Sequence, residues 1–181
     1  SQGALMKRHK FIQFDTLIFT NIAPEHIEAH GSYQKYLEAK VSIARTVAAS
    51  KKAQRIIVAN ADDAESPKFL LEGFTDRLKY SIDDAKPYNL FKEGFAITVQ
   101  GILIKSPLSG EFNIYNELAA ITYALSQNIP IETCRAAIEK LSMIRGRVEK
   151  IEIGQNFSVI VDYAHTPDSL QQFYNVFKGT R

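Results

Sequence analysis

The sequence contains a single cysteine, Cys134, among its 181 residues. One thiol excludes an intrachain disulfide and a zinc site built from cysteines, and it fits the reducing environment of the cytoplasm. No apolar run approaches the ~18 residues that a membrane span requires, and no signal peptide is apparent. The chain starts at Ser1 rather than at Met, which leads us to expect that it is part of a longer protein.

Neither sign of charge dominates, because 22 Lys and Arg residues face 20 Asp and Glu residues, for a net charge of +2. This balance argues against a basic nucleic-acid-binding arm or an acidic tail, and no basic stripe with interleaved aromatic residues is present. The phosphate-binding loops Gly-x-x-x-x-Gly-Lys-Ser/Thr and Gly-x-Gly-x-x-Gly are also missing from the sequence. The composition, 45% hydrophobic and 10% aromatic, is that of a globular chain with a sizeable core.

Strand and helix patterns alternate at both ends of the chain. Uncharged stretches rich in β-branched and aromatic residues predict buried strands at 14–22 and 55–60. Apolar residues spaced by three and four predict a helix from Ser32, its N-cap, to about Ser50. Further helices are predicted at 62–74, 113–127, 131–141 and 167–177, and short strands at 78–82, 88–92, 95–100, 102–105, 147–153 and 157–163.

This order of elements predicts an α/β fold, with a mostly parallel sheet flanked by helices and a small antiparallel insert that has one solvent-facing side. The segment after residue 142 is shorter than the ~40 residues that usually fold unaided. We therefore expect 1–142 to belong to one domain and 143–181 to begin another, whose remainder lies beyond the chain.

Polar residues at 21–30 follow a predicted buried strand, where ligands bind in open α/β sheets. His26 and His30 are four residues apart and could share a helix face at a zinc site, although a structural role for turn histidines is the alternative. Ile27 stands where the zinc protease pattern requires Glu, which argues against protease chemistry. Lys40 lies within the predicted helix, where a solvated lysine is the simplest interpretation.

A second set of polar residues lies in the latter part of the chain. Asn113 and Asn116 face one way at the start of a predicted helix, where one could cap the helix and the other could present a donor and an acceptor to a planar ligand. Arg145 and Arg147 flank Gly146, and they could hold phosphate oxygens or be ordinary surface arginines. Asp162 ends a predicted strand, where it could accept hydrogen bonds from ribose hydroxyls.

Six segments carry a family resemblance when they are taken in order. They are SQG (1–3), TNIAPEHIEAHG (20–31), YLEAK (36–40), GEFNIYNELAA (110–120), RGRVE (145–149) and DYAHTPDSL (162–170). Together they resemble the Mur ligases, the ATP-dependent amide ligases that build the peptidoglycan stem peptide. The similarity is greatest to the UDP-N-acetylmuramoyl-tripeptide synthetase branch, although Glu25 stands where that pattern usually has Asp.

The resemblance implies that 1–142 is most of a central, P-loop NTPase-like ATP-binding domain and that 143–181 begins a Rossmann-like, amino-acid-binding C-terminal domain. It implies ATP and Mg²⁺ as cofactors. The implied roles are Mg²⁺ binding for His26 and for Lys40 as a carbamate, adenine contact for Asn113 and Asn116, phosphate contact for Arg147, ribose contact for Asp162 and a further nucleotide contact for His165. Lys40 and Arg147 are the implied catalytic residues.

The resemblance also implies a cytoplasmic reaction in which an amino acid, diaminopimelate or lysine, is added to UDP-MurNAc-L-Ala-D-Glu through an acyl phosphate. We expect the chain by itself to be inactive, because it lacks the phosphate-binding loop. Neither nucleic acid nor membrane is an expected partner. Two alternatives stay open: another ligase of the superfamily, of the cyanophycin or folylpolyglutamate type, or a non-catalytic module that binds a nucleotide or a partner protein.

Overall fold

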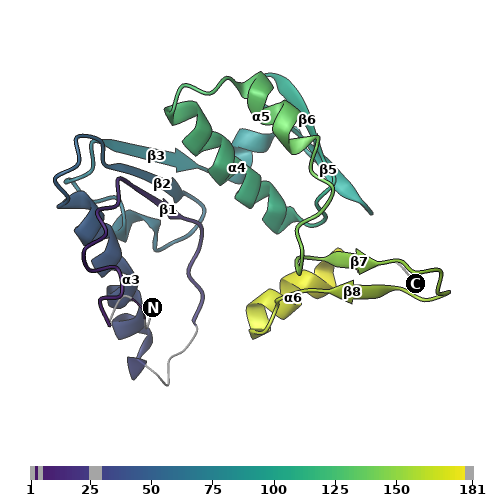
Figure 1. Cartoon of the computed structure of the whole chain (residues 1–181), viewed down its shortest axis with the longest axis horizontal. Helices are drawn as coiled ribbons and strands as arrows, with labels where there is room; N and C mark the ends of the chain where they lie inside the picture. Colours follow the sequence, from purple (N-terminus) through teal and green to yellow (C-terminus); the bar gives the residue numbers. More distant parts are fainter. Residues whose placement is uncertain (1–2, 4–5, 25–29, 178–181) are drawn as a thin grey trace. The chain divides into compact units, whose positions relative to one another are not determined.

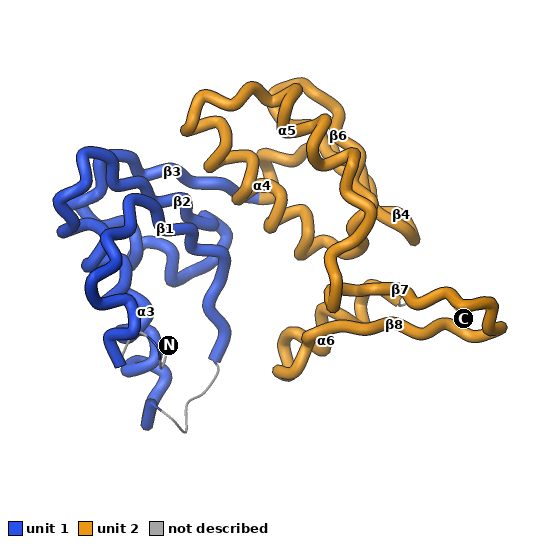
Figure 2. Tube along the Cα trace, in the orientation of Figure 1, with its two compact units in different colours: residues 1–81 blue, residues 82–181 orange. Residues whose placement is uncertain are grey.

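The computed structural model of the chain describes residues 3, 6–24 and 30–177. The chain divides into two compact units, Ser1–Ser81 (unit 1) and Ile82–Arg181 (unit 2), which Figure 2 shows in different colours. In the part of the chain that the structure describes, no helix is long and apolar enough to cross a membrane.

Unit 1 is built on a parallel sheet. Strands β1 (Thr16–Phe19), β2 (Ile56–Asn60) and β3 (Asp76–Tyr80) lie in the order β1-β2-β3, with both pairs parallel. Helix α3 (Tyr33–Ala48) packs on one face of this sheet (Figure 1). The predicted α/β class, the strand at 55–60 and the helix starting after Ser32 are confirmed.

The core of unit 1 lies between α3 and the sheet. The Ser32 hydroxyl accepts a hydrogen bond from Lys35 N at 3.2 Å and so caps the helix at the residue where the sequence predicts its start. The apolar stripe of α3 then faces the sheet, as the spacing by three and four requires. The buried residues of this core are Phe19, Leu37, Val41, Ala44, Val47, Ile57, Ala59, Phe69 and Phe74.

The helix predicted at 62–74 is wrong. Only a single 3₁₀ turn, η1 (Ser66–Lys68), forms there. Asn60 Oδ1 accepts a hydrogen bond from Asp62 N at 3.0 Å, and Asp63 Oδ1 accepts one from Glu65 N at 2.8 Å. These backbone N–H groups are therefore bonded to nearby side chains in turns and not to the carbonyl groups of a helix. The strand predicted at 78–82 lies two residues earlier, as β3, and pairs in parallel with β2.

Unit 2 begins with the predicted antiparallel insert. After a 3₁₀ turn, η2 (Ile82–Ala85), strands β4 (Asn89–Phe91), β5 (Gly94–Val99) and β6 (Ile102–Ser106) pair antiparallel in that order. The expected solvent-facing side is only partly present in β5, because Ala96 is buried as well as Phe95 and Ile97. Helices α4 (Glu111–Ser126) and α5 (Ile131–Ile138) follow and pack against each other.

The end of unit 2 is a hairpin and a helix. Strands β7 (Glu149–Ile151) and β8 (Val159–Val161) pair antiparallel and are shorter than predicted. Helix α6 (Pro167–Val176) starts with Thr166 as N-cap in a capping box and with Pro167 in its first turn, as the sequence predicts. That 143–181 begins a separate Rossmann-like domain stays a prediction.

Candidate functional site

The carboxyl ends of β1 and β2 are held together by side chains. Asn60 Nδ2 donates to the Thr20 carbonyl oxygen at 2.9 Å, and Ile22 N donates to Asp63 Oδ2, also at 2.9 Å. These bonds fix the start of the polar segment that the sequence singles out at 21–30. Asn60 and Asp63 were missed as site residues, although they too follow a buried strand at the sheet edge where ligands bind.

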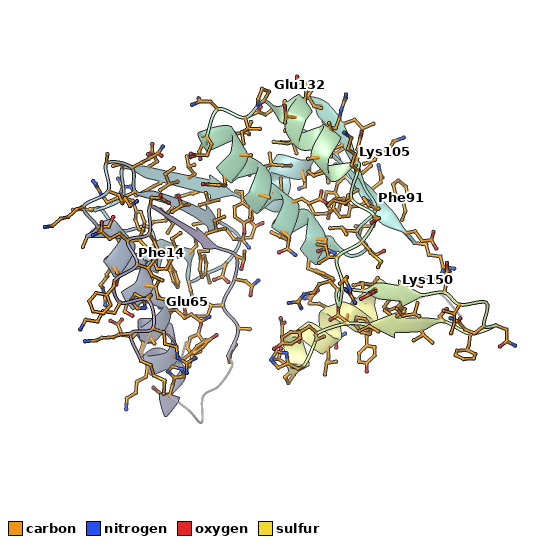
Figure 3. All side chains as sticks on the ribbon, viewed as in Figure 1. Phe14, Glu65, Phe91, Lys105, Glu132 and Lys150 are labelled. Atoms are coloured by element: carbon orange, nitrogen blue, oxygen red, sulfur yellow. The ribbon has the colours of Figure 1, made fainter. Side chains whose placement is uncertain are left out.

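A further acidic side chain, Glu65, lies in the segment that follows β2. Glu65 accepts from the Tyr33 hydroxyl at 3.3 Å and forms an ion pair with Lys68; Figure 3 labels Glu65. Burial, and then the negative charge of Glu65, raise the pKa of Tyr33, so that this hydroxyl stays a donor at neutral pH. The Tyr33–Glu65 hydrogen bond therefore ties the start of α3 to the segment that follows β2.

Lys40 is half-buried on α3, and its Nζ lies 5.5 Å from the centre of the Tyr36 ring. The His30 ring contacts Tyr36 edge to face at 5.4 Å, and His30 Nε2 is buried with no hydrogen-bond partner among the described residues. As an ammonium, Lys40 has no lone pair to offer a cation; it fits Mg²⁺ only as a carbamate, whose oxygens are hard ligands.

The predicted metal site rests on His26 as well, and His26 lies outside the described residues. The same is true of Glu25 and of the predicted pairing of His26 with His30. Among residues 6–24 and 30–177, no three His, Cys, Asp or Glu side chains come together as a metal site. The metal-binding roles of His26 and Lys40 stay predictions.

Asn113 and Asn116 form a hydrogen-bonded pair in the first turns of α4. Asn113 is 6% exposed, and its Nδ2 donates to the Ser109 carbonyl oxygen at 2.8 Å. Its Oδ1 accepts from Asn116 Nδ2 at 3.1 Å, while Asn116 is exposed. The pair is therefore asymmetric: Asn113 anchors it to the protein, and Asn116 is the member that can offer an amide edge to a ligand.

Three predicted site residues meet around Tyr163. The Arg147 Cζ lies 5.0 Å from the centre of the Tyr163 ring, and the His165 ring contacts Tyr163 edge to face at 5.0 Å. His165 Nδ1 is 2.9 Å from the Tyr163 carbonyl oxygen. Asp162, the third predicted residue, precedes Tyr163 directly. Tyr163 itself was not singled out from the sequence, where its only distinction is its place between Asp162 and His165.

Asp162 holds the backbone beside this cluster. Its Oδ2 accepts from Val148 N at 2.8 Å and its Oδ1 from Ala164 N at 2.6 Å. Val148 has φ = +48°, which is costly for a β-branched residue and persists only where the surroundings enforce it. On the other side of Arg147, Gly146 N donates to Glu149 Oε2 at 2.6 Å. Carboxylates thus fix both neighbours of Arg147, whereas Arg145 is simply exposed.

These sites belong to different units. Lys40 lies in unit 1, whereas Asn116, Arg147 and Asp162 lie in unit 2. The convergence of His26, Lys40 and Arg147 on one nucleotide stays a prediction.

Comparison with known proteins decides the family. The family model for the Mur ligase middle domain matches residues 1–124, a stretch that includes the Lys40 helix and the Asn113–Asn116 pair. The chain belongs to the Mur ligase family. The resemblance stated from the motifs is thereby confirmed.

Two relatives carry names from the tripeptide synthetase branch. A UDP-N-acetylmuramyl-tripeptide synthetase of Roseiflexus sp. (strain RS-1) is 34% identical over 182 aligned positions, covering 91% of this chain and 36% of the relative. A UDP-N-acetylmuramoyl-L-alanyl-D-glutamate–2,6-diaminopimelate ligase of Bacillus licheniformis is 34% identical over 190 positions, covering 99% of this chain and 39% of the relative. The chain thus spans little more than a third of the length of these relatives.

Solved structures share the fold. MurF from Acinetobacter baumannii superposes with a TM-score of 0.76 at 20% identity, over 92% of this chain and 38% of that one. A UDP-N-acetylmuramoyl-L-alanyl-D-glutamate–2,6-diaminopimelate ligase gives a TM-score of 0.74 at 24% identity, over 98% of this chain and 38% of that one. At such identities the likeness confirms the α/β architecture alone.

Proposed function

We propose that this Mur ligase chain is part of a cytoplasmic, ATP-dependent ligase that makes peptidoglycan precursors. The amino acid, diaminopimelate or lysine, is joined to UDP-MurNAc-L-Ala-D-Glu. Support comes from the relatives named for the tripeptide synthetase and for the diaminopimelate ligase. The structural observation that carries the proposal is the exposed cluster of Arg147, Tyr163 and His165, braced by Asp162.

The chemistry proceeds in two steps. A substrate carboxylate oxygen attacks the γ-phosphorus of ATP, the bond to the β-phosphate oxygen breaks, and ADP leaves with the bonding pair. The amine then attacks the carbonyl carbon of the acyl phosphate, loses a proton and expels phosphate. Both steps gather charge on phosphoryl oxygens, which a guanidinium held in place stabilises well.

Residues of this chain have distinct parts in the proposal. Arg147 contacts phosphate, and Asn116, anchored by Asn113, contacts adenine. Asp162 contacts the ribose, and His165 makes a further contact with the nucleotide. His26 and carbamylated Lys40 hold Mg²⁺, which when bound neutralises charge on the phosphates.

Nucleotide binding to the 181-residue chain tests this proposal. We expect ATP to shift the NMR signals of the Arg147 and Asn116 side chains, and Asn116→Ala to weaken binding of adenosine. Glu132→Gln, an exposed change on α5, serves as the control. Equal binding of ATP and UTP, or no loss on Asn116→Ala, would contradict the assignment of Asn116 to adenine.

Catalysis by the chain alone is expected to be absent. Purified chain, mixed with ATP, Mg²⁺, UDP-MurNAc-L-Ala-D-Glu and diaminopimelate, should release no ADP and form no amide above background. The sequence has no phosphate-binding glycine loop, and losing even one preorganised donor to a developing charge costs ~10²–10³ in rate. Measurable turnover would show that this expectation is wrong.

A folylpolyglutamate-type ligase is a second candidate, because the motifs that carry Asn113, Asn116 and Asp162 do not by themselves identify the acid substrate. The acid substrate separates the two. Transplanting residues 1–181 in place of the matching segment of the Bacillus licheniformis ligase should retain addition of diaminopimelate if the first proposal is right. Loss of that activity in a folded, nucleotide-binding chimera would contradict the first proposal.

A further inference from the structure

A buried acid lies one helical turn after Asn113, on the same side of α4. Glu117 is 5% exposed. Its Oε1 accepts a hydrogen bond from Ser106 Oγ at 2.5 Å, while its Oε2 is buried with no hydrogen-bond partner among the described residues. A buried carboxylate that lacks a cation and has one oxygen unsatisfied is costly. A role in core packing alone does not explain why an ionisable side chain occupies this buried position.

Ser106 connects Glu117 to the segment that leads into α4. Ser106 ends β6, where it pairs with Phe95 of β5, and its Oγ also accepts from Leu108 N at 3.2 Å. Gly94 has φ = +117°, and a Cβ there would lie 2.1 Å from the Ser106 carbonyl oxygen. The backbone at Ser106 is therefore closely confined, so its hydroxyl is a fixed point to which Glu117 attaches.

The other end of this segment is held by Asn113. Ser109, three residues after Ser106, accepts through its carbonyl oxygen from Asn113 Nδ2. Residues on two successive turns of α4, Asn113 and Glu117, thus grip the two ends of the 106–109 segment. A shift of that segment would move the partner of Asn113, which is hydrogen-bonded to Asn116.

We propose that Glu117 is a positioning residue of the nucleotide site: as a neutral acid it holds the 106–109 segment against α4 and thereby fixes the Asn113–Asn116 pair. The proposal rests on the proposed function only where it assigns Asn116 to adenine. When Glu117 loses its proton, the charge lies in a site with one hydrogen bond. The hydrogen bond from Ser106 favours the ionised form, but it cannot replace the lost solvation of the charge. The carboxylate therefore draws in water or turns outward, and this movement loosens the grip on Ser106.

The surroundings of Glu117 support this behaviour. Burial raises the pKa of Glu117 to about 7, and the hydrogen bond from Ser106 opposes that shift without cancelling it. The charged side chains on β6 and on the elements that contact α4 are exposed, and none is a cause of the shift; they are Asp83, Asp84, Lys105, Glu132 and Arg135. Figure 3 labels Lys105 and Glu132. No cation among them neutralises the ionised form.

NMR of the ¹⁵N-labelled 181-residue chain tests the proposal between pH about 5.5 and about 8.5. The backbone amides of Leu108 and Ser109 and the side-chain amide of Asn116 should titrate together with a midpoint near 7. In Glu117→Gln, which keeps the shape but cannot ionise, the three signals should be flat. Glu132→Gln should leave the titration unchanged. Silent signals in the unaltered chain, or the same titration in Glu117→Gln, would overturn the proposal.

Ser106→Ala provides a second route if Glu117→Gln fails to fold. It leaves the acid in place and removes the link, so the Asn116 amide should stop responding while the Glu117 carboxyl carbon still titrates. An Asn116 response that survives in Ser106→Ala would show that the coupling does not pass through Ser106, against the proposal.

Adenosine, which has no group that titrates in this range, separates the positioning role from the proposed function. Its binding should weaken about threefold between pH about 6 and about 8.5, an energy change within reach of one lost hydrogen bond. Glu117→Gln should remove this dependence. Titrating amides without any adenosine binding would refute the nucleotide site, while the coupling of Glu117 to the Asn113–Asn116 pair would be retained. Adenosine binding that does not depend on pH, with amide signals that do not titrate, would support the nucleotide site and refute the role of Glu117.

Discussion

The Arg147 guanidinium lies over the Tyr163 ring, with its Cζ 5.0 Å from the ring centre. Both side chains are exposed, so the ring holds an arginine that would otherwise sample many rotamers in water. Asp162 and Glu149 also fix the backbone on either side of Arg147, so the start of its side chain is held in place as well. Such preorganisation suits the binding of phosphate.

Replacing Tyr163 by Leu should weaken ATP binding about two- to fivefold, since an exposed cation–π contact contributes ~0.5–1 kcal/mol. Tyr163→Phe retains the ring and should bind ATP as the unaltered chain does. Isothermal titration calorimetry provides the measurement. Adenosine, which carries no phosphate, serves as the control ligand. An equal loss of affinity for adenosine would show that Tyr163 does not act through Arg147.

Replacing Asp162 by Ala should release the strained conformation of Val148. The change removes a charged acceptor from two backbone N–H groups, at a cost of ~1–3 kcal/mol in local stability. Hydrogen exchange of the Val148 and Ala164 amides should therefore accelerate by about tenfold or more. Glu152→Gln, on an exposed ion pair with Lys150, should leave both rates unchanged. Unaltered protection in Asp162→Ala would mean that other contacts hold Val148.

Elements that local signals define were predicted well. Helix α3 follows from its Ser32 cap and apolar stripe, and α6 from Thr166 and Pro167, because these signals lie within the element itself. The failed helix at 62–74 has a different cause. The Asp63 carboxylate accepts hydrogen bonds from Ile22 N, 41 residues earlier in the chain, and from Glu65 N in a local turn. The spacing of apolar residues within 62–74 carries no information about a hydrogen-bond partner as distant in the chain as Ile22.

The candidate site shows the same division. The residue types of Asn113, Arg147 and Asp162 were readable from the motifs, but their contacts were not. That Asp162 grips Val148 depends on the pairing of β7 with β8. That Glu117 is buried depends on how α4 meets Ser106 of β6. In the sequence, Glu117 is one more polar residue on a helix.

The hydrogen bonds that Asp63 accepts at the sheet edge of unit 1 give another prediction. Asp63→Ala should remove the acceptor of Ile22 N and of Glu65 N and destabilise unit 1 by ~1.5–3 kcal/mol. The matched control is Glu72→Gln, an exposed acid in the same unit, for which we expect no more than ~0.5 kcal/mol. Urea unfolding, followed by the NMR signals of Ile57 and Val58, reports on unit 1. Equal midpoints for Asp63→Ala and Glu72→Gln would show that the hydrogen bonds of Asp63 do not stabilise unit 1.

Carbamylation of Lys40 is open to direct observation. In this reaction the neutral Nζ attacks the carbon of CO₂, an N–C bond forms, one C–O π bond becomes a carboxylate lone pair, and a proton leaves Nζ. Chain incubated with ¹³C-bicarbonate should show a carbamate carbon signal. Lys40→Arg should lack the signal, and Lys35→Arg, a change at an exposed position on the same helix, should keep it. No Lys40-dependent signal would remove Lys40 from the proposed Mg²⁺ ligands.

Glu117 also makes the stability of unit 2 depend on pH, and the sign follows from its raised pKa. Between the ordinary value of 4.5 and about 7, the folded chain holds a proton that the unfolded chain has released, so stability falls as pH rises. The contribution is complete below pH 4.5 and is lost by pH about 7, with an upper limit of ~3 kcal/mol. Hydrogen exchange of the Ile104 amide, extrapolated to a common intrinsic rate, measures it. Glu117→Gln should flatten the profile across this window, whereas Glu132→Gln should not; a profile that rises towards pH 7 would have the opposite sign to the one expected of a buried, neutral acid.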